Sequence, residues 1–472
     1  MSLTRKIAYN TLVQSVGRVL SAFIGFGVIA ATARYLGRAG FGQYTTVMAF
    51  SGFFSTIAGM GISLVVTNEI GKKNLNLNKF LSNAFSLRIF TSAAILGLGA
   101  LVGFLMPYPA LVKQAIAVDC FAFFLLSFRH VFDGLFFREL KTSKLVLAEI
   151  SGRLLTLGLV LWSVWKAKGL LNIVWAVAWG NLVQSLLVYL FTLPYAKIRF
   201  QTDFKVWKYI FHRSWPLALS MVFNLVYFKF DTIILSLLKP EADVGIYGAA
   251  YKILELLIAF PILFCSLVLP QFALYRRSDP ARFQRIFQKS FDFLIVGTVP
   301  LAICIFFFAP QMIHIISGPD FDPSIRVLQI LSVAIGIIFL AALPSHLIVA
   351  LDQQKKMIWG YLVGAIFAVS LDLILIPLFS YIGAAVTTVL VELLILIWSF
   401  YLVRKSYYLS WKKGILGRSI LAGAVLFLFF ILFPSWNFAV RFVCGAALYL
   451  AVLYLIGGLP KDILKESLSI KK

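Results

Sequence analysis

Charged residues are scarce in this sequence, and acidic residues are the scarcest. Only 13% of its 472 residues are Asp, Glu, Lys or Arg, and 19 of them are acidic. A soluble domain is about a quarter charged and about half apolar, whereas 61% of this chain is hydrophobic. So much apolar surface cannot be buried in one water-facing core. The composition therefore excludes an ordinary soluble protein and indicates that the bilayer is the solvent.

The sequence also lacks the usual residues for catalysis, metal binding and nucleotide binding. The four cysteines stand singly inside apolar runs, so we expect free buried thiols and no metal site. No G-x-x-x-x-G-K-[ST] motif occurs, and the four histidines are far apart and belong to no motif. We predict that the protein is neither an enzyme nor an ATPase. Its only expected cofactor is a coupling ion, a proton or sodium.

Apolar stretches of about 20 residues, the length that crosses a bilayer, recur along the whole chain. Dividing the sequence this way gives about 14 of them, the first centred near Ser21 and the last near Leu448. We predict an all-α polytopic membrane protein with about 14 transmembrane helices.

The net charge of +24 is distributed in a way that argues against nucleic acid as a partner. Alternate loops separate by charge, with 29 basic residues on one side of the predicted membrane and eight on the other. Lys and Arg concentrate in cytoplasmic loops. The bias therefore predicts a multi-pass protein of the cytoplasmic (plasma) membrane with both termini in the cytoplasm.

A short motif that follows the first span returns in the second half of the chain. Gly42-Gln43-Tyr44 and Gly245-Ile246-Tyr247 lie 203 residues apart, each opening an apolar run after a polar turn. Internal repeats of this length are typical of transporters. We predict a six-helix lobe at 1–195, a basic cytoplasmic linker at 196–213, a second six-helix lobe at 214–405, and two extra helices with a short basic tail at 406–472.

The residues that carry this repeat also resemble a known family. A basic N-terminus, Tyr35-Leu36-Gly37, the Gly42 motif, the run from Phe230 to Leu235 and the run from Val244 to Tyr251 resemble the Wzx-type polysaccharide-biosynthesis and O-antigen flippases. These belong to the multidrug/oligosaccharidyl-lipid/polysaccharide (MOP) superfamily. The resemblance implies two six-helix lobes around a central cavity. By alternating access, these would move a polyprenyl-pyrophosphate-linked oligosaccharide to the outer leaflet, with polysaccharide assembly enzymes as partners.

Charged residues inside spans are costly and are functional hypotheses by default. The first lobe carries four arginines in spans, and guanidinium groups suit a pyrophosphate because they donate bidentate hydrogen bonds. The alternative is that these side chains reach the inner headgroups, or that Arg153 pairs with Glu149 one turn earlier. Arg18 is the strongest candidate because the small-residue row Gly17, Ser21 and Gly25 predicts close approach by another helix. The predicted anion-binding residues are Arg18, Arg88, Arg129, Arg153, Lys229 and Lys252.

The second lobe mixes both signs of charge. Lys252 and Glu255 stand one turn apart and could neutralise each other. Asp372 and Glu392 have no local partner, so they are candidates for a proton or sodium site, with a structural link to a lysine as the alternative. The predicted ion-coupling residues are Asp231, Asp372 and Glu392.

Two other functions compete with the flippase. An ion-coupled multidrug exporter of the same superfamily would need a cavity that accepts cations, which the arginines of the first lobe oppose. A membrane-embedded glycosyltransferase or polymerase would need acidic residues on long outward loops, and the outward loops here are short.

Overall fold

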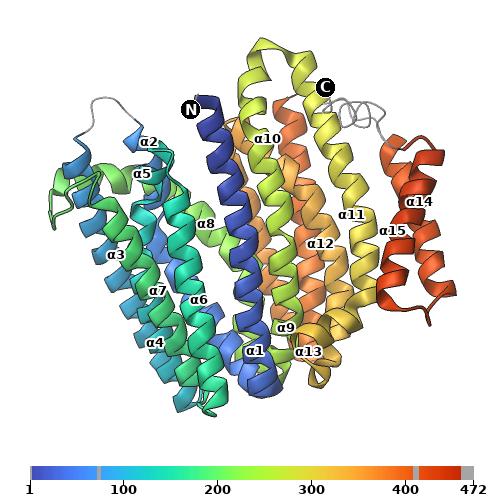
Figure 1. Ribbon diagram of the computed structural model, residues 1–472, viewed down its shortest axis with the longest axis horizontal. Helices are drawn as coiled ribbons and strands as arrows, with labels where there is room; N and C mark the ends of the chain where they lie inside the picture. The colour runs from blue at the N-terminus through green and yellow to red at the C-terminus, as the bar shows by residue number, and fades with distance from the viewer. Residues whose placement is uncertain (1–2, 72–75, 408–413, 459–472) are drawn as a thin grey trace. The chain divides into compact units, whose positions relative to one another are not determined.

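The computed structural model describes residues 3–71, 76–407 and 414–458 (Figure 1). Several basic residues of the predicted loops and tail lie outside these ranges, namely Lys72, Lys73, Lys412, Lys413, Lys461, Lys465, Lys471 and Lys472. All regular elements in the described ranges are helices. In the first half they are α1 (Leu3–Gly59), α2 (Ile62–Ile70), α3 (Leu77–Leu105), α4 (Ala110–Ser127), η1 (Arg129–Val131), α5 (Asp133–Arg138), α6 (Ser143–Trp165), α7 (Leu170–Thr192) and α8 (Phe204–Leu238). The second half contains α9 (Glu241–Leu257), α10 (Ala259–Ser278), α11 (Pro280–Ile316), η2 (Pro319–Phe321), α12 (Pro323–Ala350), α13 (Gln354–Ser406), α14 (Gly414–Leu432) and α15 (Phe438–Leu455).

Among the described residues, 12 helical segments are long and apolar enough to cross a membrane. Two of them are far longer than one crossing requires: Leu12–Ile70 has 59 residues and Gln354–Ser406 has 53. A crossing takes about 20 residues, and each of these segments is interrupted by a non-helical residue, Gly37 and Ser380 respectively. Each therefore accommodates two crossings, which brings the total to the predicted fourteen.

The two interruptions are stabilised in different ways. Gly37 has a φ of 65°, in the left-handed region that glycine adopts without steric cost. It lies in the turn that the sequence predicts at Tyr35-Leu36-Gly37. Ser380 has a φ of 49°, which is unfavourable for a residue with a side chain. Its hydroxyl donates a hydrogen bond to the carboxylate of Asp243, and this contact holds the turn in α13.

The chain forms two compact units. Unit 1 comprises Met1–Gly248, Ile315–Asp320 and Val369–Tyr381; unit 2 comprises Ala249–His314, Phe321–Ala368 and Ile382–Lys472. Unit 1 thus continues through the predicted linker at 196–213, whose second half already belongs to α8.

In unit 1, α4 packs against α3 and α7, and α6 packs against α7 and α1 (Figure 1). The short helices α2 and α5 meet at one end of this layer, where a wholly buried apolar cluster includes Val66, Leu81 and Phe136. The rings of Phe85, Phe132 and Tyr189 contact one another there, with centroids 5.5 to 6.3 Å apart. The cluster also includes Ile210, so the first turns of α8 pack against these helices.

In unit 2, α14 and α15 form a hairpin around Phe430, which is fully buried (Figure 1). Gly423 lets α14 approach Val299 of α11, and Tyr449 donates a hydrogen bond to the carbonyl of Val296 at 3.0 Å. The two predicted extra helices are therefore packed against α11.

Candidate functional site

The two copies of the repeated motif pack directly against each other in unit 1. A Cβ atom added at Gly42 in α1 would overlap the backbone carbonyl of Glu241, and one added at Gly245 in α9 would overlap the carbonyl of Arg38. A shift of 203 residues converts either contact into the other, since 42 becomes 245 and 38 becomes 241. The pairing is therefore reciprocal, as in contacts about a two-fold axis.

Side chains around this glycine crossing follow the same relation. Gly248 meets the side chain of Thr45, and these residues are again 203 positions apart. Gln43 donates a hydrogen bond to the carboxylate of Glu241 at 2.7 Å. The predicted internal repeat is thus confirmed in three dimensions, and only glycine allows the two backbones to approach so closely.

In unit 1, the carboxylate of Glu149 binds two of the four predicted arginines. Glu149 on α6 lies 3.5 Å from Arg129 of η1 and 3.3 Å from Arg153 of its own helix. It also accepts a 2.7 Å hydrogen bond from the hydroxyl of Ser21 on α1. The side chains are 13% exposed for Arg129, 25% for Glu149 and 44% for Arg153. Two positive charges share one negative charge, so this Glu149 cluster can still attract an anion.

The small-residue row of α1 faces this cluster. A Cβ atom at Gly17 would overlap Val146 of α6, and one at Gly25 would overlap the guanidinium group of Arg153. The close helix approach predicted from Gly17, Ser21 and Gly25 is therefore present, and α6 is the neighbour.

The other two predicted arginines of unit 1 are placed differently. Arg18 lies on an exposed face of α1, one turn before Ser21. Arg88 on α3 is only 4% exposed, and its Nη1 donates to the backbone carbonyl of Ala58 at 3.1 Å. The structure therefore brings Arg129 and Arg153 together, whereas Arg88 binds the end of α1.

The predicted charges of α8, α9 and α13 are mostly buried. Lys229 is half-buried on α8, and Asp231 accepts hydrogen bonds from the hydroxyl of Tyr247 and the backbone of Thr232. Lys252 and Glu255 form the predicted local pair, at 2.7 Å. Asp372 and Glu392 are 1% and 4% exposed and lie on the two arms of α13.

Sequence reasoning missed a further acidic residue in unit 1. Asp119, in the middle of α4, is fully buried, and neither of its carboxylate oxygens has a hydrogen-bond partner in the described part of the chain. The sequence signal for it is that Asp119 is the one carboxylate in the apolar run from Ala115 to Phe124.

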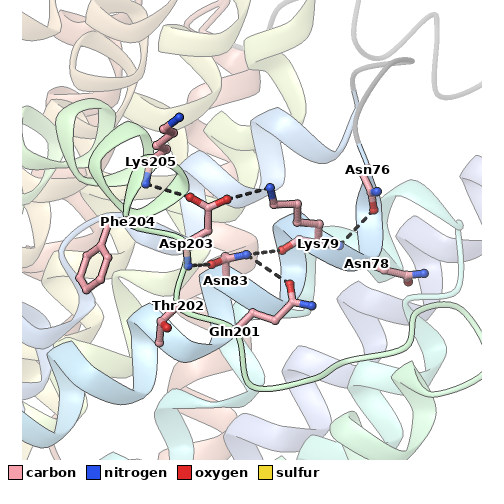
Figure 2. A pocket seen from close by; sticks show the side chains of 9 residues that line it. All are labelled: Asn76, Asn78, Lys79, Asn83, Gln201, Thr202, Asp203, Phe204 and Lys205. Carbon is pink, nitrogen blue, oxygen red and sulfur yellow. Dashed lines mark hydrogen bonds and ion pairs between the residues drawn. The ribbon is translucent and has the colours of Figure 1, made fainter.

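Sequence reasoning also missed how the predicted linker is fixed. Residues 196–203 form an extended segment, here called the strap, that runs along the first turns of α3 (Figure 2). The backbone N–H groups of Lys197, Arg199 and Gln201 donate to side chains of Asn78, Ser82 and Ser86, each at 3.0 Å. Two extended residues rise about 6.6 Å and four helical residues about 6 Å. Every second residue of the strap therefore meets every fourth residue of α3.

The end of the strap caps α8 and closes a polar groove of about 830 Å³. Asp203 accepts from the backbone of Lys205, binds Lys79 at 2.7 Å, and donates its N–H to Asn83 (Figure 2). The hydrogen bond from Lys79 lowers the pKa of Asp203 below its ordinary value, and the backbone hydrogen bond from Lys205 adds to this effect. The polar residues of the groove bind one another, and these contacts fix the strap to α3.

The helix number, the repeat and the glycine crossing together define a polytopic membrane transporter fold. The structure is similar to the lipid II flippase MurJ in an inward closed conformation, with a TM-score of 0.78 and 13% identity over 96% of this chain and 99% of that chain. It is also similar to an inward-facing multidrug resistance MATE family transporter of the MOP superfamily, with a TM-score of 0.66 and 15% identity over 82% and 94% of the two chains. At these identities the similarity shows the fold.

The sequence itself identifies the family. Residues 6–275, more than half of the chain, match the model of the polysaccharide biosynthesis protein family. The chain belongs to this family, and the resemblance to the Wzx-type flippases of the MOP superfamily is confirmed. None of the curated protein sequences matches it.

Proposed function

We propose that this protein flips a polyprenyl-pyrophosphate-linked oligosaccharide across the cytoplasmic membrane for cell-surface polysaccharide synthesis. The Glu149 cluster is the observation that carries the proposal, because it places two guanidinium groups on one carboxylate within membrane-spanning helices. An excess of bidentate donors in a span suits a pyrophosphate and repels a cation. Membership of the polysaccharide biosynthesis protein family and the similarity of the fold to MurJ also support this proposal.

The predicted anion-binding residues differ in how readily they could reach a headgroup. Arg18 and Arg153 are exposed or partly exposed, so they are the first contacts in this proposal. Arg129 and Lys229 are less exposed and act after them. Arg88 and Lys252 already bind protein groups and must exchange those partners to bind phosphate.

Energy for transport comes from an ion gradient in this proposal. Asp231, Asp372 and Glu392 are buried carboxylates in membrane-spanning helices, where ionisable residues commonly serve ion pathways. The coupling ion is a proton or sodium. Both termini lie in the cytoplasm, where assembly enzymes deliver the lipid-linked substrate, and nucleic acid is not a partner.

The alternative function is ion-coupled export of cationic drugs. It is favoured by the similarity to a multidrug resistance MATE family transporter and by the buried carboxylate of Asp119. The Glu149 cluster opposes it, because a cationic drug would meet two guanidinium groups.

The first test measures the leaflet distribution of polyprenyl-linked glycans in cells with and without the protein. Deletion should trap glycan on the cytoplasmic face, and wild type should reverse this. Loss of one charge-assisted contact in Arg18→Ala should slow flipping about 10- to 100-fold, with Arg18→Lys intermediate and the surface variant Arg138→Ala unchanged. Full transport by both Arg18 variants would remove this arginine from the pathway. An unchanged glycan distribution together with altered sensitivity to cationic drugs would favour the exporter.

The second test asks whether the glycine crossing opens during transport. In a background without the four native cysteines, Gln43→Cys with Glu241→Cys places one thiol on each side of the crossing, at residues whose side-chain ends now lie 2.7 Å apart. Oxidation should stop flipping, and reduction should restore it. Lys79→Cys with Asp203→Cys is the matched control, since it cross-links α3 to the strap at a pair whose side-chain ends are equally close. Full transport by the oxidised Gln43–Glu241 pair would show that the crossing stays closed throughout.

A further inference from the structure

We propose that Asp119 is a proton-binding site built into unit 1, separate from the carboxylates proposed above for ion coupling. Asp119 lies nine residues after Ala110 and eight before Ser127, far from the free N–H groups at the start of α4. Its side chain is fully buried, and both carboxylate oxygens are without a hydrogen bond in the described ranges. An aspartate side chain in this position is either protonated and neutral, or charged at a high cost in free energy.

Among the described residues, no basic side chain binds Asp119. The helices packed against α4 are α1, α3 and α7, together with η1. The whole of α7 contains no Asp, Glu, Lys, Arg or His. Basic groups of the other elements contact different partners: Arg88 contacts Ala58, Arg129 contacts Glu149, His130 contacts Asp133, Arg34 contacts Ile315, Arg38 contacts Asp320 and Lys79 contacts Asp203. Arg18 lies in the other arm of α1, 33 residues before Ser51.

The groups that do face Asp119 are weakly polar. Ser51 of α1 is fully buried and lies beside the carboxylate without reaching hydrogen-bonding geometry. The neighbouring thiol of Cys120 donates to the Ser51 hydroxyl at 3.8 Å. The serine O–H is available to the carboxylate once the proton leaves. One serine and one carboxyl group provide too few oxygens to replace the hydration shell of a metal cation, so the proton is the ligand that fits.

The proposed route for the proton is a cavity that Cys120, the residue next to Asp119, helps to line. A cavity of about 260 Å³ lies between α3 and α4, lined by Ser92, Cys120, Phe121 and neighbouring apolar residues. The hydroxyl of Ser92 is buried there and, among the described residues, has no partner. The cavity has room for several waters, yet its lining is mostly apolar. Asp119 keeps its proton while the cavity is dry and releases it when water enters.

This arrangement couples protonation to movement of α1 against α4. Desolvation disfavours the charged carboxylate, so the closed packing of Ser51 on α4 favours the protonated form. By linkage, loss of the proton favours separation of the two helices and entry of water. The inference rests on the burial of Asp119 and holds for any transported substrate.

Infrared spectroscopy on the full-length protein in lipid vesicles tests the proposal directly. At neutral pH we expect a C=O band of protonated carboxylic acids, and Asp119→Asn should remove one component of it. The control Asp203→Asn, at a partly exposed carboxylate paired with Lys79, should leave that band unchanged. If wild type and Asp119→Asn have identical spectra in this region, Asp119 is ionised and the proposal is wrong.

A second measurement needs no variant and so does not depend on the variant folding. A membrane-soluble carbodiimide reacts with protonated carboxyl groups, and mass spectrometry then locates the adduct. Labelling of Asp119 at neutral pH, undiminished by sodium, supports a proton site. Protection by sodium would replace it with a sodium site, and the absence of both label and infrared band would overturn it. Neither readout involves transport, so a failure here is distinct from a failure of the flippase proposal.

Discussion

Two carboxylates of unit 1, Glu149 and Asp119, face serines of α1 but lie in opposite electrostatic environments. Glu149 accepts from Ser21 and binds Arg129 and Arg153. Asp119 lies beside Ser51, and in the described part of the chain its two oxygens have no hydrogen-bond partner. Burying a charge is costly unless it is paired. The comparison shows that one unit pairs one acidic residue with two cations and isolates another, and the proposal above makes the isolated one neutral.

Removing the negative charge at Glu149 should have the largest effect on stability. In Glu149→Gln, Arg129 and Arg153 are left facing each other and Ser21 loses a charged acceptor. We expect a loss of about 2 kcal/mol in the free energy of unfolding, below the roughly 3–5 kcal/mol of a fully buried pair because these groups are partly exposed. Denaturant unfolding in mixed micelles measures it.

The control is Glu139→Gln. Glu139 and Arg138 are exposed and 4.0 Å apart, so their loss should cost less than about 0.5 kcal/mol. Equal costs for the two glutamate variants would mean that the Glu149 cluster contributes no more than a surface pair.

The two arginines of the cluster should not be equivalent. Arg129 is 13% exposed and Arg153 is 44% exposed. Arg129→Gln should therefore cost about 1–2 kcal/mol, and Arg153→Gln less than about 1 kcal/mol because solvent screens it. The same unfolding measurement applies, and a larger loss from Arg153→Gln would show that contact with Gly25, rather than charge, determines the ranking.

Neutralising Asp119 should change stability least of the membrane-spanning substitutions. Asn has nearly the shape of a protonated Asp, so Asp119→Asn should stay within about 1 kcal/mol of wild type. The sign of a larger change is informative. If Asp119 were charged, removing that charge would relieve its desolvation and stabilise the protein by several kcal/mol. A marked gain in stability would therefore contradict the difference drawn here between Glu149 and Asp119.

Sequence periodicity was sufficient for the local parts of this structure. The fourteen crossings follow from the length of apolar runs, and the break at Gly37 follows from a polar turn that ends in glycine. Pairs within one helix, such as Glu149 with Arg153 and Lys252 with Glu255, follow from helical spacing. The sequence repeat correctly paired Gly42 with Gly245 at an offset of 203 residues. It did not predict that the two copies contact each other directly.

The remaining features depend on contacts between distant segments, which spacing does not encode. Arg129 reaches Glu149 from η1, twenty residues away, only because the chain turns back at α5 and α6. The strap binds α3 because extended and helical rises happen to match over residues 197–201. Nothing in the predicted basic linker indicated that its backbone would be held by serines. The environment of Asp119 likewise required knowledge of which helices surround α4.

Asp203 completes the comparison as a carboxylate paired in water, and it should show the smallest effect. Because Lys79 lowers its pKa in the folded protein, the pair contributes stability above the ordinary Asp value of 3.8 and loses it as the pH falls through the lower folded value. In Asp203→Asn this acid-dependent loss should be absent, so the wild-type and variant melting temperatures should converge as the pH is lowered from 6 to 3. Since Asp203 also caps α8, and Asn is a good cap as well, the substitution isolates the ion pair. If the two melting temperatures keep a constant difference over this range, the Lys79–Asp203 contact does not anchor the strap through charge, and the backbone hydrogen bonds to the asparagines and serines of α3 hold it.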